Sequence, residues 1–261
     1  MRDQLRVLKH SAIASWAEFT AFYTWKTWTF TWLSRLLIQV CFYALIGRMI
    51  GSVDYLLVGN AVAIMAIDAC VVILLAIGER RSGTLSLMVA APSTHLTIYL
   101  GRGLIHLVSG VVASVTAFLV LPPLFGVHLP WPQALLVPVL ITAVGLSCYC
   151  YGACVASFVL GFPAARWLAL NISYLTLMTF CGVNVPTDFW PDWVRRVVSF
   201  LPMTHGLTAM RALIANGPAS TVVTQVVLEL LVGAAWFALA AVGFNRMVRR
   251  GRRDGSIEFG A

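Results

Sequence analysis

Charged residues are scarce in this chain of 261 residues: only 11% are Asp, Glu, Lys or Arg, whereas 60% are hydrophobic. A soluble domain carries about 25% charged and about 45–50% apolar residues. One globular core cannot hide this much apolar side chain from water, because the buried fraction of a chain is limited by its size. The shortage of charge therefore excludes an ordinary water-soluble domain and predicts an integral membrane protein.

Motifs of soluble enzymes are missing as well. Only two lysines occur, Lys9 and Lys26, and no glycine-rich loop ending in Lys and Ser or Thr is present to cradle a phosphate. No pair of histidines has metal-binding spacing, and no nucleophile elbow is found. The six cysteines lie in apolar stretches, as packing residues do. We expect no catalytic residue, cofactor or metal in this chain.

Long apolar runs are present instead. A membrane-spanning helix needs about 20 apolar residues. Six stretches qualify: 33–51, 55–78, 97–121, 133–160, 166–185 and 222–245. The fourth is long enough to tilt or to kink at Pro138. Two small-residue pairs, Gly47 with Gly51 and Gly152 with Ala156, have the spacing at which helices approach closely within one chain. The predicted fold class is an all-α membrane protein with six transmembrane helices and a single domain over residues 1–261.

The segment before the first span mixes charged and aromatic residues. Leu5, Leu8, Trp16, Phe19 and Tyr23 recur at helical spacing between charged side chains, which predicts an amphipathic interfacial helix over residues 1–32. Trp25, Trp28 and Trp32 are suited to the headgroup layer as well. The alternative is that residues 19–32 extend the first span.

The basic residues set the orientation of the chain. With the N-terminus inside, fourteen Lys and Arg residues fall on the cytoplasmic side and four outside, and residues 246–261 form a basic cytoplasmic tail. Such a bias places both termini in the cytoplasm of a multi-pass plasma-membrane protein. The net charge of +8 lies at the edges of apolar runs, which argues against a nucleic-acid partner.

Two connections between spans are long. The cytoplasmic one, 79–95, has charges at its start and Pro92 near its end, which predicts a short amphipathic helix. The outer one, 186–220, is too apolar for a free loop. We expect it to dip into the outer leaflet as short helices broken at Pro191 and Pro202.

Three polar residues fall within predicted spans: Asp68, His106 and Glu229. A charge at the centre of a span costs roughly 3 kcal/mol or more, so each carboxylate needs a reason to be there. They are candidates for a transport pathway, facing a polar seam, each other or His106. The alternative is a structural role within the bundle. Arg35 and Arg102, near cytoplasmic ends, are expected to snorkel.

Two motifs resemble a known family. Glu79-Arg80-Arg81-x-Gly83-Thr84-Leu85, ahead of Ala91-Pro92, is similar to the loop after the second span in permeases of the type-2 ABC transporter family. The outer segment, with Phe189-Trp190-Pro191 and then Leu201-Pro202-Met203-Thr204-His205-Gly206-Leu207 and Arg211, resembles the same family. Together with the number of spans and the N-terminal helix, the resemblance covers nearly the whole chain.

The resemblance implies a function and a set of partners. It implies a permease that dimerises with a second permease chain, expected to be identical, and couples to two ABC ATPase subunits, which hold ATP and Mg. Residues Glu79, Arg80, Arg81, Gly83, Thr84 and Leu85 would contact the ATPase, and Phe189, Trp190, Pro202 and Arg211 would belong to the outer segment. The cargo implied is a drug, natural product or other hydrophobic or amphiphilic compound, moved outwards among membrane lipid.

Three other functions remain open from the sequence. The permease could instead export a lipid-linked glycan or polysaccharide. A secondary transporter could move protons through Asp68 and Glu229, although inverted repeats are not visible. An intramembrane lipid-modifying enzyme would need His106, Asp68 and Glu229 to converge at one depth.

Overall fold

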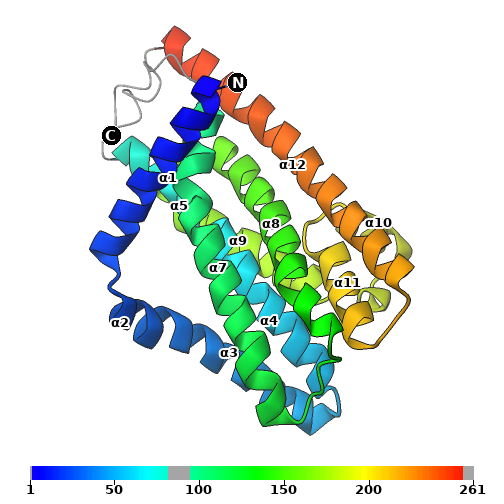
Figure 1. Cartoon of the computed structure of the whole chain (residues 1–261). Helices are drawn as coiled ribbons and strands as arrows, with labels where there is room; N and C mark the ends of the chain where they lie inside the picture. Colours follow the sequence, from blue (N-terminus) through cyan, green and yellow to red (C-terminus); the bar gives the residue numbers. More distant parts are fainter. Residues whose placement is uncertain (1, 82–94, 255–261) are drawn as a thin grey trace.

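A computed structural model describes residues 2–81 and 95–254, and all regular secondary structure within these ranges is helical (Figure 1). The longer helices are α1 (Arg2–Phe22), α3 (Ser34–Ile50), α4 (Val53–Cys70), α5 (Val72–Arg81), α7 (His95–Phe125), α8 (Val137–Val159), α9 (Arg166–Phe180), α11 (Thr204–Ile214) and α12 (Ala219–Asp254). The shorter ones are α2 (Trp25–Thr27), the π-helical η1 (Trp28–Leu33), η2 (Gln133–Leu136), η3 (Pro163–Ala165), η4 (Thr187–Phe189) and α10 (Asp192–Val198).

Five helical segments of the described residues are long and apolar enough to cross a membrane. They are Trp25–Ile50, Val53–Leu75, Thr97–Phe125, Gln133–Val159 and Ala219–Arg249. The predicted all-α membrane fold is confirmed, but six spans are not. The stretch predicted as the fifth span is α9, whose 15 residues extend about 22 Å. Gly182, with a φ of 87°, lies just beyond it in a conformation that does not continue a helix.

The second span is the central helix of the bundle. Of its 18 most apolar consecutive residues, 89% are buried inside the protein, whereas the corresponding share for the last span is 17%. Small residues on α4 and its neighbours allow this enclosure. A Cβ added at Gly110 or Gly145 would come within 2.8 or 2.2 Å of Met65. The neighbouring helices α7 and α8 therefore approach α4 as closely as glycine permits.

The N-terminal segment divides earlier than expected. Helix α1 ends at Phe22, and Thr24 begins a new helix by accepting a hydrogen bond from the backbone N–H of Thr27 at 3.3 Å. From Trp25 the helix runs through α2, η1 and α3 as one apolar segment to Ile50. The boundary thus differs from the predicted one at residue 32, and the alternative of a longer first span describes the observed helix better.

Two local features differ from their expected form. Pro138 does not kink a helix: it occupies the first turn of α8, where a missing N–H costs nothing. Gly47 and Gly51 bring two spans together at their connection: Gly51 ends α3 with a φ of 74°, and a Cβ at Gly47 would come within 2.9 Å of Val53, the first residue of α4. The pair builds the sharp turn between α3 and α4. Gly152, by contrast, contacts Cys70 and Val72, as expected for close packing within the chain.

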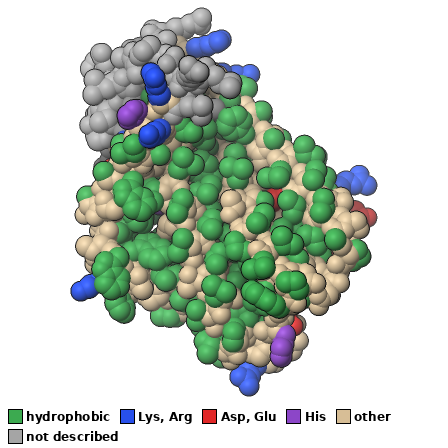
Figure 2. Space-filling model, viewed as in Figure 1, with side chains coloured by type: hydrophobic (Ala, Val, Ile, Leu, Met, Phe, Trp, Pro, Cys, Tyr) green, Lys and Arg blue, Asp and Glu red, His purple; other side chains and the backbone are tan. Residues whose placement is uncertain are grey.

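The surface around the helix bundle is largely apolar. Figure 2 shows hydrophobic side chains over the middle of the visible face and Lys and Arg at its edges. Large side chains such as Phe42, Leu119 and Phe158 are exposed. A water-soluble monomer rarely exposes apolar surface on this scale. The described surface is that of a membrane protein.

Candidate functional site: an aromatic cavity beside the first span

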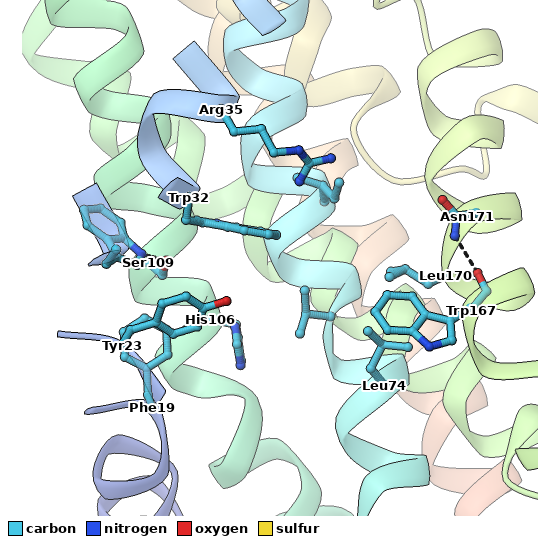
Figure 3. A pocket seen from close by; sticks show the side chains of 13 residues that line it. Phe19, Tyr23, Trp32, Arg35, Leu74, His106, Ser109, Trp167, Leu170 and Asn171 are labelled. Atoms are coloured by element: carbon cyan, nitrogen blue, oxygen red, sulfur yellow. Dashed lines mark hydrogen bonds between the residues drawn. The ribbon is translucent and has the colours of Figure 1, made fainter. Parts of the chain in front are cut away.

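A cavity of about 410 Å³ lies where α1, the first span, the α4–α5 helix, α7 and α9 meet (Figure 3). Its lining residues are Phe19, Tyr23, Trp28, Trp32, Arg35, Ile67, Val71, Leu74, His106, Ser109, Trp167, Leu170 and Asn171. The wall is rich in aromatic rings and carries a few polar groups. Cavities of this size and composition are the usual form of small-molecule sites.

Asp68 lies behind the wall of this cavity and is 1% exposed. Its Oδ1 accepts a hydrogen bond from the indole N–H of Trp32 at 2.9 Å, and its Oδ2 accepts one from the hydroxyl of Ser109 at 3.2 Å. The Ser109 oxygen in turn accepts from the indole N–H of Trp28 at 3.0 Å. One buried carboxylate therefore fixes two aromatic rings of the cavity wall, one directly and one through Ser109.

Helix α1 closes one side of the cavity and is tied to α7. Glu18 forms an ion pair with Arg102 at 2.6 Å, and the hydroxyl of Ser15 donates to the backbone carbonyl of Arg102. One turn further along α7, the ring of Phe19 meets that of His106 edge to face, with 5.8 Å between centroids. The predicted pathway residue His106 thus lines the cavity at the point where α1 covers it.

Glu229 belongs to a different site. It is fully buried in α12 and lies at the N-terminus of α11. Its Oε1 accepts from the backbone N–H of Met203 at 2.7 Å and its Oε2 from that of Gly206 at 2.9 Å. The first N–H groups of a helix lack partners within the helix and carry partial positive charge. The carboxylate satisfies both needs and joins α12 to α11.

The three polar residues of the spans are therefore only partly brought together. Asp68 and His106 both lie at the aromatic cavity, whereas Glu229 lies at the α11–α12 joint. Within the described ranges no hydrogen bond links Asp68 to Glu229 or either of them to His106. The expectation that the carboxylates face each other is not supported.

Arg211, from α11, holds the turn that follows α9. Its Nη2 donates to the carbonyl of Gly182 at 2.7 Å, and its guanidinium lies 3.5 Å from the ring centre of Tyr55. The Tyr55 hydroxyl donates to the same carbonyl at 2.8 Å. Gly59 allows this turn to lie against α4, since a Cβ there would come within 2.3 Å of the carbonyl oxygen of Val183. Arg211 therefore joins three segments of the outer region.

The other outer-segment residues have separate positions. Phe189 is exposed, and Trp190 packs between Phe180 and Phe189 at centroid distances of 5.0 and 5.5 Å. Pro202 is buried just before α11. The short helices η4, α10 and α11 agree with the expected breaks at Pro191 and Pro202.

The coupling residues cannot be placed in the same detail. Glu79, Arg80 and Arg81 are the last three residues of α5, and their backbone continues the second span. Gly83, Thr84 and Leu85 lie outside the described residues. Their role in contacting an ATPase stays a prediction.

Sequence reasoning missed the roles of Trp28 and Ser109. The tryptophans were assigned to the headgroup layer, although Trp28 and Trp32 are four residues apart and hence share a helix face. Two indole donors on one face, together with a nearby intramembrane acid at Asp68, were a usable signal. It was obscured by the expected end of the interfacial helix at residue 32.

A bundle of long apolar helices with an apolar outer surface belongs to the class of polytopic membrane proteins. The chain is a member of the ABC-2 type transporter family, which matches residues 12–215. It is thus the membrane-spanning permease component of an ABC transporter and not the catalytic subunit, and permeases of this family partner with an ATPase subunit. No curated protein matches the chain.

Proposed function

We propose that this chain is the permease of an ATP-driven exporter whose cargo is a hydrophobic or amphiphilic compound such as a drug or natural product. The aromatic cavity carries this proposal. It lies beside the first half of α7, toward the end of the bundle at which α1 begins and α12 ends (Figure 1). The basic residues predict that this end faces the cytoplasm. A compound dissolved in the inner leaflet would reach the cavity from the side on which an exporter loads.

Energy would come from partner chains. We expect two ATPase subunits, with ATP and Mg bound to them, to dock on residues 79–95. Because Glu79–Arg81 continue the helix of the second span, movement of the docked loop would be passed directly to a wall of the cavity. A second, identical permease would complete the transporter, as the resemblance to type-2 permeases implies.

The structure gives the alternatives less support. A lipid-linked glycan would need a longer groove than a cavity of about 410 Å³ offers. A proton-coupled transporter or a lipid-modifying enzyme would need Asp68 and Glu229 to act together, yet they bond to different helices. Export of a small amphiphile fits the described residues best.

The test is ATP-dependent transport by the permease co-expressed with its ATPase in inverted vesicles. Glu79→Ala and Gly83→Pro should uncouple export from ATP hydrolysis while insertion stays normal, because one removes a charge at the docking site and the other bends the predicted helix that must move as a rigid body. Arg48→Ala, at the opposite end of α3, is the matched control. Transport that collapses with the proton gradient and ignores ATP would refute the proposal.

Orientation is tested separately by labelling single cysteines in intact cells. With native cysteines replaced, a cysteine at position 82 should be protected from a membrane-impermeant reagent, whereas one at position 189 should react, because Phe189 is exposed in the outer segment. Labelling at position 82 from outside would overturn the predicted topology.

A further inference from the structure

The cavity wall is built for a flat ring system. Five of its residues are aromatic: Phe19, Tyr23, Trp28, Trp32 and Trp167. Figure 3 shows Trp32 with Arg35 on one side of the space and Trp167 on the other. Aromatic faces favour stacked or edge-on contact with another ring. The cavity therefore offers a planar ligand partners from several directions.

Two of these rings are fixed before any ligand arrives. The hydrogen bonds from Trp32 to Asp68 and from Trp28 through Ser109 to Asp68 restrict both indoles. A wall that is already ordered loses less side-chain entropy on binding. Asp68 thus serves as a positioning residue, because its oxygens face the indoles and Ser109 and it does not itself line the cavity.

The charge offered to a ligand is positive. Among the lining residues that the structure describes, Arg35 is the one that carries a full charge. Its guanidinium lies 5.5 Å from the ring centre of Trp32 and within electrostatic range of Asp68, and no hydrogen bond reaches it from the described residues. Both oxygens of Asp68 already accept hydrogen bonds. A cationic ligand would meet repulsion from Arg35 and an acid that is already engaged.

We propose that the cavity binds a planar aromatic compound bearing an acidic group, with the rings between Trp32 and Trp167 and the acid on Arg35. Arginine presents several N–H donors in one plane and binds a carboxylate with two parallel hydrogen bonds. The proposal rests on the proposed export function and narrows it, because it names the chemical class of the cargo.

The test is equilibrium binding to the full chain in lipid nanodiscs, without ATPase or ATP. The probes are 1-pyrenebutyric acid, 1-pyrenebutanol and 4-(1-pyrenyl)butyltrimethylammonium, which share a ring system and differ in charge. Energy transfer from tryptophan to pyrene reports binding, and empty nanodiscs correct for partition into lipid. We expect the acid to bind at least tenfold more tightly than the cation, with the alcohol between them.

Variants assign the effect to named residues. Arg35→Gln should weaken binding of the acid about tenfold and leave the alcohol unchanged, whereas Arg35→Lys should restore part of the affinity. Asp68→Ala should weaken binding of the alcohol as well as the acid, because it removes the acceptor that holds the indole of Trp32 and the hydroxyl of Ser109. Arg48→Gln, which removes an arginine at the far end of the same helix, should change nothing.

Two outcomes would overturn the inference: preference for the cationic probe, or equal binding of the acid by Arg35→Gln and the unaltered protein. Either could occur while ATP-dependent export and its loss in Glu79→Ala remain as proposed. Failure of the ligand class is therefore distinguishable from failure of the exporter function.

Discussion

Asp68 and Glu229 are both buried carboxylates in membrane spans, and in both each oxygen accepts a hydrogen bond. They differ in what donates. Glu229 is held by backbone N–H groups at the start of α11, whereas Asp68 is held by side chains at a cavity wall. A backbone donor cannot turn away when its acceptor is lost, but an indole or hydroxyl can. The comparison indicates that the type of hydrogen-bond donor determines the role of a buried carboxylate. Backbone donors make it part of the fold, and side-chain donors make it part of a cavity wall.

The largest expected effect is that of Glu229→Gln. An amide has one acceptor, so its NH₂ group would face a backbone N–H that also donates, either at Met203 or at Gly206. A buried donor left without a partner costs about 2–3 kcal/mol, and we expect a fall in Tm of roughly 5–10 °C. Thermal unfolding in detergent measures it, with Glu18→Gln as the exposed control. An unchanged Tm would remove the distinction between the two acids.

Gly206→Ala should come next, because it separates α11 from α8. The added Cβ would lie 2.1 Å from Cγ2 of Val144, so the Val144 side chain or one of the two helices must move. Overpacking of this kind costs about 1–3 kcal/mol. Val144→Ala in the same chain should restore most of the loss, while Gly161→Ala, with nothing nearer than 3.9 Å, should be neutral in the same unfolding assay. Failure of the rescue would show that close approach is not what positions α11.

A smaller effect is expected at the cavity. Asp68→Ala and Trp32→Phe each remove one partner of the same hydrogen bond, so their effects on unfolding should be less than additive, with a coupling of about 1 kcal/mol. Trp131→Phe is the control, since Trp131 is exposed. Strict additivity would mean that the indole and the carboxylate do not interact. A coupling as large as the Glu229 effect would make Asp68 structural as well.

The smallest effect should come from the ion pair between Glu18 and Arg102. Both side chains are partly exposed, at 46% and 23%. Pairs of this kind contribute about 0.5 kcal/mol and weaken in salt. Glu18→Gln should therefore lower the Tm slightly at low salt and not at all at high salt. A loss above about 1 kcal/mol would place this surface carboxylate in the same class as the buried ones.

The sequence predicted the fold class and most of the spans because bilayer thickness imposes a length and composition on each helix. It did not show the features that local geometry decides. Helix α9 stops at Phe180 and Gly182 turns the chain, which a hydropathy run over residues 166–185 does not reveal. Pro138 predicts a kink only if the helix begins well before it, and α8 begins at Val137.

The candidate site was predicted in part. Asp68, His106 and Glu229 stood out because a polar residue within a span requires an explanation. Which of them share a site depends on helix rotation and on pairing between distant segments, as in the contact of Trp28 with Ser109, 81 residues apart. Arg211 stands out in the sequence only as part of a motif. Its hydrogen bond to the carbonyl of Gly182 depends on the turn after α9, and hydrophobic periodicity does not predict that turn.

The contact at Gly59 has an evolutionary consequence. The carbonyl of Val183 occupies the space that any side chain at position 59 would need. Natural variation at this position is therefore constrained by the path of a turn more than a hundred residues away along the chain. A relative with alanine or a larger residue here must route that turn differently. Position 59 can thus serve, in an alignment of permeases, as a marker of those that share this outer architecture.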